Sequence, residues 1–235
     1  MRNILLGATA LVSSVMFLVP GAQAFDWNGP YVGGVVGVVK STGSIDWTFY
    51  DNFAEESASG TFDFGGLGAL AGVTAGFNYM LSDGFVVGIE GDASLAWLKS
   101  SGIDEQEFFY YGEFEEELQS LLTLRGRFGV LSADTNTLFF VTGGVAGGNV
   151  KASAHLDEFF AEDPSTAAEM SGFVFGVIGG VGVEHAIKED LTVKAELLAY
   201  SLGSLDGTGY AGKGDSIATY HPSGIIFRTG INFHF

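Results

Sequence analysis

The chain closes on GIIFRTGINFHF, residues 224–235, and this stretch decides the fold. Its side chains fall into two alternating sets, one almost wholly apolar and the other mostly polar or small. The first set is Ile225, Phe227, Thr229, Ile231, Phe233 and Phe235, and the second is Ile226, Arg228, Gly230, Asn232 and His234. A period of two indicates a β-strand with two unlike faces. Such a strand needs an apolar environment on one side up to its last residue.

The first 24 residues have the features of a secretory signal peptide. Arg2 gives a positive start, an apolar run follows from Ile4 to Val19, and Ala22-Gln23-Ala24 is a small-x-small cleavage site. The alternative is an N-terminal transmembrane helix, for which the run is short. We therefore expect residues 1–24 to be a cleaved signal peptide and residues 25–235 to form a single exported domain.

Composition restricts the protein class. There is no cysteine, which excludes a disulfide-stapled scaffold and thiolate metal sites. The formal net charge is −18, which argues against nucleic acid as a partner. The mean hydropathy is +0.30, yet no stretch after residue 24 has the length of unbroken apolar sequence that a membrane helix needs. High hydropathy without such helices is typical of strands whose alternate side chains face lipid.

Eight strands are predicted along the mature chain, at 31–40, 68–80, 84–98, 117–130, 137–150, 172–186, 191–202 and 224–235. Short turns and long connections alternate between them. Because an unpaired strand edge is costly in lipid, an antiparallel meander of this kind must close on itself. The sequence therefore predicts an all-β fold, an eight-stranded antiparallel up-and-down transmembrane β-barrel, with its long loops outside the cell.

Charged residues alternate with apolar ones on several of these strands, which assigns them to the barrel interior. Four acids and four bases are assigned there: Glu90, Asp92, Glu184, Glu196, Arg125, Arg127, Lys194 and Arg228. Buried charge is tolerable only when it is paired and hydrogen-bonded. We expect a charge network that closes or narrows the lumen of this small barrel. The alternative is a cation-selective pore in which the charges stay partly hydrated.

The long connections are strongly acidic. Seventeen of the 28 acidic residues lie in 41–67, 99–117 and 151–171. They form either a solvated canopy or sites where divalent cations bridge to lipopolysaccharide phosphates. Lys40, Lys99 and Lys151 each fall where an outward-running strand ends. We expect them to contact lipopolysaccharide phosphates; the alternative is ordinary snorkelling.

An aromatic run, Phe108 to Phe114, stands out in the second long connection. It either contacts a host surface, haemin or a neighbouring protein, or extends the barrel wall.

Nothing in the sequence indicates catalysis, a metal site or a cofactor. His155 and Asp157 share one connection and His221 lies in another, but their spacing does not favour a catalytic dyad or triad. There is no HExxH motif, P-loop or calcium loop. We therefore expect a protein that is not an enzyme, with no catalytic residues, no metal ligands and no cofactor.

Several segments resemble one known family. WNGPYVGG (27–34), LRGRFG (124–129), VTGGVAGG (141–148), GVEHAIKEDLTVKAELLAYSLG (182–203) and FRTGINFHF (227–235) occur in the order seen there. Together they resemble the Omp25/Omp31-type outer-membrane β-barrels of alphaproteobacteria, the porin family. The resemblance implies an abundant surface barrel in the Gram-negative outer membrane. It also implies that the terminal Phe235 is the signal read by the outer-membrane assembly machinery.

Function follows from the resemblance and from the residue pattern. We expect a non-enzymatic barrel that supports envelope integrity and associates with outer-membrane lipids and lipopolysaccharide. One alternative is a small diffusion channel. Another is a surface receptor or adhesin whose loops bind haemin or a host ligand.

Overall fold

A computed structural model describes residues 25–51, 56–63, 65–81, 84–106, 110–158, 166–211 and 214–235. The expected signal peptide, residues 1–24, lies outside the described residues. The strands are β1 (Gly29–Ser41), β2 (Ser44–Asp51), β3 (Glu56–Asp63), β4 (Leu67–Met80), β5 (Phe85–Gln106), β6 (Tyr110–Leu131), β7 (Thr137–Glu158), β8 (Thr166–Lys188), β9 (Leu191–Leu202), β10 (Leu205–Ala211), β11 (Gly214–His221) and β12 (Ser223–His234). In this part of the chain no helix is long and apolar enough to cross a membrane.

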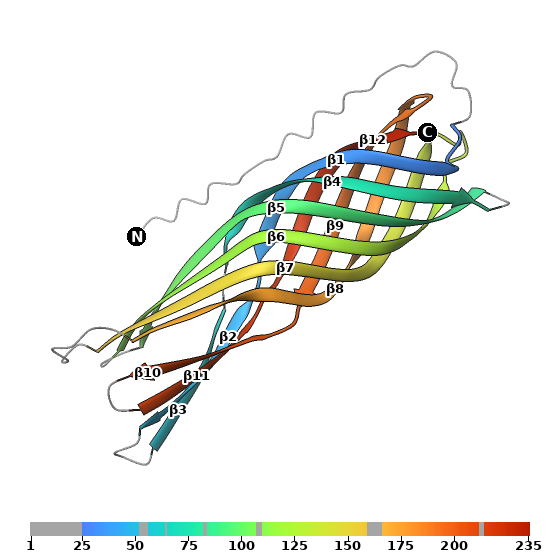
Figure 1. Cartoon of the computed structure of the whole chain (residues 1–235). Helices are drawn as coiled ribbons and strands as arrows, with labels where there is room; N and C mark the ends of the chain where they lie inside the picture. The colour runs from blue at the N-terminus through green and yellow to red at the C-terminus, as the bar shows by residue number, and fades with distance from the viewer. Residues whose placement is uncertain are drawn as a thin grey trace, which may run out of the picture.

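Eight of these strands form a closed antiparallel barrel in the order β1-β12-β9-β8-β7-β6-β5-β4 (Figure 1). Each of the eight predicted strands overlaps one of them, so the predicted fold class is confirmed. The short turns that join β4 to β5, β6 to β7 and β8 to β9 lie at the same end as the C-terminus. We call this the proximal end and the opposite end the distal end.

The barrel closes between the first and last strands. β1 pairs with β12 from Tyr31, opposite His234, to Ser41, opposite Gly224. The backbone N–H of Phe235 donates to the carbonyl oxygen of Pro30 at 3.1 Å and continues this pairing to the last residue. Closure leaves no free edge in the barrel, which is the requirement that lipid imposes on a sheet.

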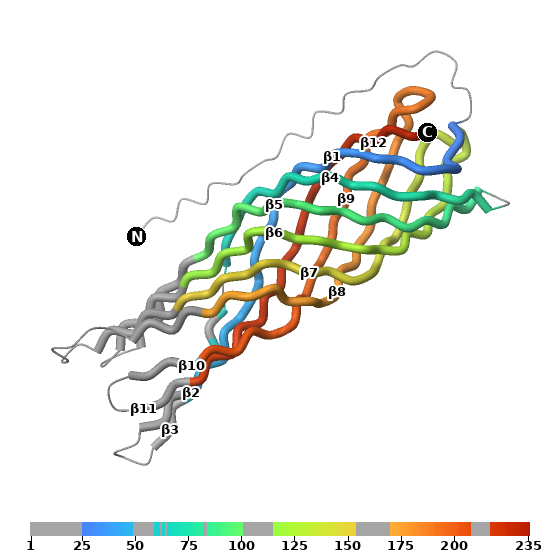
Figure 2. The backbone as a smooth tube through the Cα atoms, viewed as in Figure 1, coloured from blue at the N-terminus to red at the C-terminus, as the bar shows by residue number. Residues whose placement is uncertain are grey.

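The expected long loops are largely β-structure, and this corrects the prediction. Segments 41–67 and 203–223 contain a second sheet with the order β10-β11-β2-β3. The strands β5 to β8 also run past their expected distal ends, to Gln106, Tyr110, Glu158 and Thr166. Figure 1 shows both groups beyond the distal end, and the coloured tube in Figure 2 shows where they leave the barrel. The acids in these segments obscured the alternation that predicts a strand. The segments form strands nevertheless, because each has an antiparallel neighbour that supplies its backbone hydrogen bonds whatever its charge.

The aromatic run belongs partly to this extension. Residues 107–109 lie outside the described residues. From Tyr110 onward the backbone is part of β6, with Tyr110 opposite Gln106 of β5 and Glu158 of β7. The backbone of this part of the run therefore extends the strand wall.

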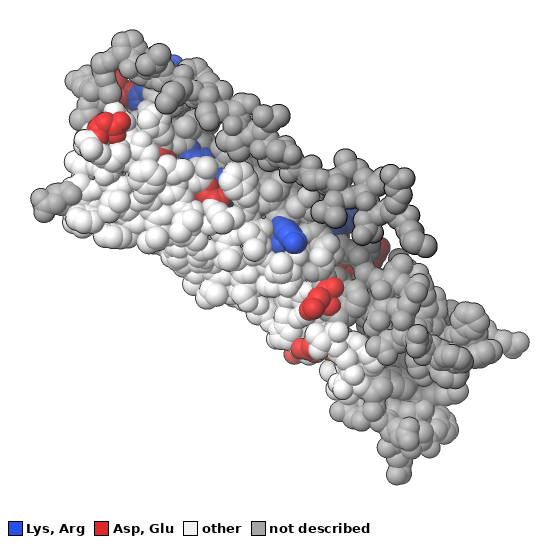
Figure 3. All heavy atoms as spheres, turned by 180° about the vertical axis from the view of Figure 1, so that it is seen from behind, with Lys and Arg blue, Asp and Glu red and all other residues white. Residues whose placement is uncertain are grey.

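The two faces of the barrel wall differ as a membrane requires. Outward side chains are large and apolar, for example Leu95, Trp97 and Val141, which are 61%, 60% and 54% exposed. On the face in Figure 3 the described wall carries only scattered charged side chains. Such a wall suits contact with lipid chains, because an apolar band facing them has no polar group to desolvate.

A bulge in β6 reverses the direction of its side chains. Proximal to it, odd-numbered residues such as Leu121 and Thr123 are buried inside. The register shifts between Leu118 and Ser120, and beyond the shift Glu116 and Leu118 are the buried residues. A bulge inserts one residue into one strand of a pair, so it exchanges the two faces beyond it. The carboxyl of Glu116 is thereby brought to the inside of the distal extension.

We predict that Val145→Arg destabilises the barrel by about 2–4 kcal/mol, because the substitution places a charge midway along the lipid-facing wall, between Phe139 and Lys151 of β7. Val130→Arg near the proximal turn is the matched control and should cost about 0–1 kcal/mol. Urea unfolding of both variants in lipid vesicles measures the difference. Equal costs at the two positions would contradict the assignment of this wall to lipid.

Candidate functional site

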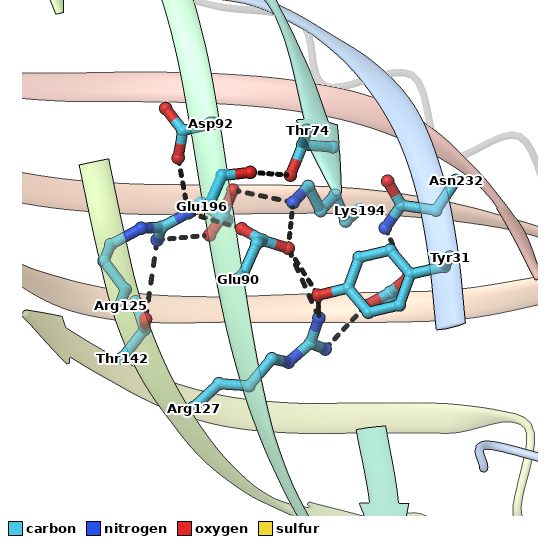
Figure 4. Close-up of polar contacts among 12 residues, drawn as sticks. Tyr31, Thr74, Glu90, Asp92, Arg125, Arg127, Thr142, Lys194, Glu196 and Asn232 are labelled. Carbon is cyan, nitrogen blue, oxygen red and sulfur yellow. Dashed lines mark hydrogen bonds and ion pairs between the residues drawn. The ribbon is translucent and has the colours of Figure 1, made fainter. Parts of the chain in front are cut away.

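The barrel interior contains a layer of buried charge at mid-height, which we call the charged layer. It consists of the eight residues predicted for the interior: Glu90, Asp92, Arg125, Arg127, Glu184, Lys194, Glu196 and Arg228. All are buried, with exposures between 0% and 7%. They come from five strands, β5, β6, β8, β9 and β12. Ion pairs join all eight in one place. Figure 4 shows Glu90, Asp92, Arg125, Arg127, Lys194 and Glu196 pointing toward one another.

Strand register supplies the first contacts of the charged layer. Glu90 lies opposite Arg125 across β5 and β6, Glu184 lies opposite Lys194 across β8 and β9, and Glu196 lies opposite Arg228 across β9 and β12. Opposite residues on neighbouring strands have closely spaced side chains on one face. Two of these facing pairs, Glu90–Arg125 and Glu196–Arg228, are ion pairs, so part of the charge is matched between neighbouring strands.

Arg125 joins the two sides of the lumen. Its guanidinium pairs with Glu90, with Asp92 at 3.1 Å and with Glu196 at 3.0 Å. Glu90 and Asp92 come from the neighbouring strand β5, whereas Glu196 comes from β9. A guanidinium has five donors in a planar fork, so one arginine can pair with several carboxylates at once.

Arg228 and Lys194 complete the pairing of these carboxylates. Arg228 Nε lies 2.8 Å from Glu196 and its Nη1 lies 3.0 Å from Asp92. Lys194 Nζ lies 2.7 Å from Glu90. Each carboxylate in this half of the layer therefore contacts at least two cations, which offsets the cost of removing it from water.

The proximal half of the layer is built around Arg127 and Glu184, which lie 2.6 Å apart. The Tyr31 hydroxyl accepts a hydrogen bond from Arg127 at 2.9 Å and donates one to Glu90 at 2.7 Å. Glu184 also accepts hydrogen bonds from Thr192 at 2.6 Å and Asn232 at 2.7 Å. Tyr31 thus links the two halves into one network.

These neutral members were not predicted. Asn232 occupies the polar face of the C-terminal strand, and Thr192 the face that also carries Lys194 and Glu196, so alternation alone would have placed both inside. Tyr31 gave no such signal, because the Gly-rich sequence of β1 leaves its two faces ambiguous.

Glycine makes room for the long charged side chains. Gly37 lies opposite Arg228, and a Cβ at Gly37 would come within 2.6 Å of the Arg228 Cβ. A larger residue there would force the arginine out of its position. Several glycines in these strands are therefore a packing requirement of a narrow, filled barrel.

Apolar side chains fill the interior on both sides of the charged layer. The proximal apolar cluster consists of Phe25, Trp27, Val86, Leu138 and Phe140. The distal apolar cluster is larger and includes Leu70, Leu98, Leu118, Val150, Val174, Leu198 and Ile226. Neither cluster was predicted from the sequence, because the inner face was expected to carry charged side chains. Two consecutive apolar residues in a strand indicate such a cluster. In Leu197-Leu198, for example, the first side chain faces outward and the second faces inward.

The histidines considered for catalysis are dispersed. His221 is half-exposed in β11, and its Nε2 lies 3.5 Å from Asp46. His155 and Asp157 lie on β7, and their side chains are outside the described residues. Within the described ranges no group of three or more His, Cys, Asp or Glu residues is arranged to hold a metal ion.

Comparison with known proteins agrees with this geometry. Residues 8–233 match the family model of the outer membrane protein beta-barrel domain. The chain belongs to this family. It is also similar to the 31 kDa outer-membrane immunogenic protein of Brucella melitensis biotype 1 and of Brucella suis biovar 1. The identity to each is 29% over 205 residues, which cover 83% of this chain and 82% of the relative.

Solved structures support the same fold. The outer membrane protein OprG from Pseudomonas aeruginosa matches with a TM-score of 0.50 and 10% identity, over 91% of this chain and 100% of that one. The predicted resemblance to the Omp25/Omp31 type is thereby confirmed, and the protein is an outer-membrane protein.

The three lysines predicted to meet lipopolysaccharide lie at the distal end of the membrane-facing wall, and all are exposed. Lys99 and Lys151 flank Glu117 across β5, β6 and β7. Lys40 lies apart from them on β1, opposite Ile225 of β12. Phe235 is 71% exposed at the proximal end, directly beside β1.

We predict that Arg125→Met lowers the free energy of unfolding by about 3–5 kcal/mol, because it leaves buried carboxylates short of a cation. Urea unfolding of the refolded protein measures the loss. Lys188→Met removes an exposed cation near the proximal turn and is the control, with an expected change within about 0.5 kcal/mol. An Arg125→Met variant as stable as the control would contradict a cooperative charged layer.

Proposed function

We propose that this protein is a non-enzymatic outer-membrane barrel with a closed lumen, which supports the envelope and associates with lipopolysaccharide. The observation that carries the proposal is the filled interior. Apolar side chains, paired charges and apolar side chains again follow one another along the barrel. A barrel of eight strands has an interior just wide enough for such filling. A protein built in this way suits a structural role in the membrane better than transport through its centre.

The orientation of the barrel across the membrane is proposed from the usual arrangement of turns and loops in outer-membrane barrels. We place the distal end outside the cell, because outer-membrane barrels keep short turns on the periplasmic side and long connections on the cell surface. The acidic segments of β2, β3 and the extended β5 to β8 then face the medium. Their charge favours a solvated, self-repelling surface. The Brucella relatives are described as immunogenic, which fits a protein with an exposed surface of this kind.

Conductance tests the closed lumen. We expect no steady ion conductance when the refolded protein is inserted into a planar bilayer. Arg125→Ala should raise conductance only slightly, because the two apolar clusters still fill the barrel above and below the substituted position. A large and steady conductance from the unmodified protein would refute the closed lumen and favour the diffusion channel.

Lipopolysaccharide association rests on the lysines at the distal end of the wall. We propose that the ammonium groups of Lys40, Lys99 and Lys151 contact its phosphates, since an ammonium is an effective phosphate partner. The triple variant with alanine at these positions should co-purify with less lipopolysaccharide than the unmodified protein. Lys188→Ala, at the proximal end, is the control and should leave the amount unchanged. Equal co-purification of the triple variant would end this assignment.

A further inference from the structure

Beyond the distal end of the barrel, the wall continues as two separate bodies. One is the second sheet, with the order β10-β11-β2-β3, and the other is the distal extension of β5 to β8. Within the described ranges no strand pairing joins the two bodies, although β10 lies beside β8. Figure 1 shows them diverging as they leave the barrel. In this part of the chain, side-chain contacts hold the second sheet against the distal extension.

Short connections join the second sheet to the barrel. They are Thr42-Gly43 between β1 and β2, residues 64–66 between β3 and β4, Gly203-Ser204 between β9 and β10, and Pro222 between β11 and β12. The pairing of β1 with β12 stops at Ser41, and the pairing of β2 with β11 starts at Ser44. Short connections at the ends of strands are common hinge points between rigid bodies. The second sheet can therefore turn about this line while the barrel below it stays closed.

The interface between the two bodies is mostly apolar. Buried side chains of the distal apolar cluster on its two sides are Ile45 and Ala218 from the second sheet, and Ala152 and Met170 from the distal extension. β10 approaches β8 so closely that a Cβ at Gly207 would lie 2.3 Å from Met170 Cγ. Burial of apolar surface favours closure at any pH. A pH dependence of closure therefore needs an ionisable group within the interface.

Glu116 is such a group, and it bridges the two bodies. It is 2% exposed and, unlike the four carboxylates of the charged layer, forms no ion pair within the described ranges. One of its oxygens accepts a hydrogen bond from Ser41 Oγ at 2.6 Å, and the other contacts the hydroxyl of Tyr220. Ser41 is the last residue of β1, and Tyr220 belongs to β11. The carboxyl thus joins the distal extension to the barrel rim and to the second sheet.

Burial of the Glu116 carboxyl raises its pKa, although the hydrogen bonds from Ser41 and Tyr220 act in the opposite direction. The buried arrangement therefore favours the protonated carboxyl over the carboxylate. Closure takes up a proton under these conditions. It is thus favoured as the pH falls and disfavoured as the pH rises through the raised pKa of Glu116.

The groups around Glu116 supply no compensating positive charge. Burial and the neighbouring Glu116 raise the pKa of Tyr220, so its phenol stays neutral. Tyr200 of β9 is the other ionisable side chain on this side, and a phenol is neutral below about pH 10. The lysines on the neighbouring strands, Lys40, Lys99 and Lys151, are exposed on the outward face. Among the described residues, the charge of Glu116 itself therefore decides the electrostatic cost of closure.

We propose that the second sheet is a hinged flap and that Glu116 is its pH-sensitive latch. With Glu116 protonated, the flap is closed, and a hydroxyl of Ser41 or Tyr220 accepts the carboxyl proton, because a hydroxyl both donates and accepts. When Glu116 releases its proton to solvent, the carboxylate gains hydration if the flap turns away from the distal extension. Opening exposes apolar side chains such as Ile45 and Met170, while the charged layer keeps the lumen filled.

A distance between two nitroxide labels tests the latch, and the chain has no cysteine of its own to interfere. The labelled positions are I217C on β11 and S171C on β8, whose side chains are exposed. Pulsed electron paramagnetic resonance of the refolded protein in lipid vesicles measures the separation at about pH 4 and about pH 9, on either side of the glutamate range. The labels should be close, with a narrow distribution, at the lower pH, and farther apart at the higher pH.

Two variants assign the change to one carboxyl. E116Q keeps the shape of the side chain without its charge, so the labels should stay close at both pH values. E117Q removes the neighbouring outward-facing carboxylate and is the matched control, which should open as the protein with both glutamates does. Repulsion among the other acids of these segments also grows with pH, and E116Q leaves that repulsion in place.

Two outcomes would overturn the proposal. One is an unchanged label separation between the two pH values when Glu116 is intact. The other is an E116Q variant that opens as far as the protein with Glu116, which would assign the opening to general repulsion among exposed acids. If E116Q fails to fold, as judged by its migration on unboiled gels, E116M takes its place with the same expectation.

Discussion

Every backbone N–H and C=O group that lies in lipid must find its partner within the protein. In this chain that constraint determines the pairing of each barrel strand. β1 and β12 are the first and last strands in the sequence, and they must nevertheless pair along their whole length. The terminal Phe235 continues the pairing, because a strand that ended earlier would leave backbone groups of β1 exposed to the membrane. The apolar exterior and the charged interior both follow from a sheet that has no edge.

Closure also explains why the interior holds so much charge. Eight strands enclose a narrow space, and every second residue on each strand must point into it. Lipid contact uses the apolar set, so polar residues are left for the inner face. Four carboxylates and four cations satisfy one another there, with hydroxyl and amide groups from Tyr31, Thr192 and Asn232 completing the shell. Few large apolar side chains therefore lie in the middle of the barrel interior.

The residue pattern predicted the barrel strands, and the eight charged residues that it assigned to the interior lie buried there, for one physical reason. In a half-buried strand every second side chain faces the same environment, and Glu90, Arg125 and Arg228 all occupy inward positions of this alternation. The pattern failed where the two faces of a strand differ little in residue type. Glycine does not distinguish the faces of β1, so Tyr31 was missed. Near the distal end both faces of the barrel wall are apolar, so alternation did not predict the distal apolar cluster. The strands β2 and β3 carry acidic residues, and the sequence pattern predicted loops there.

The bulge in β6 has a consequence for how this gene can change. Deleting the single codon for Gln119 would remove the bulge and restore regular alternation. Leu118 would then stand two positions before Leu121, so Leu118 and Glu116 would keep the inward face that they have now. Deleting a regularly paired residue of the same strand would instead turn over every side chain beyond it. The bulge is therefore a place where this strand can lose a residue without exchanging its two faces.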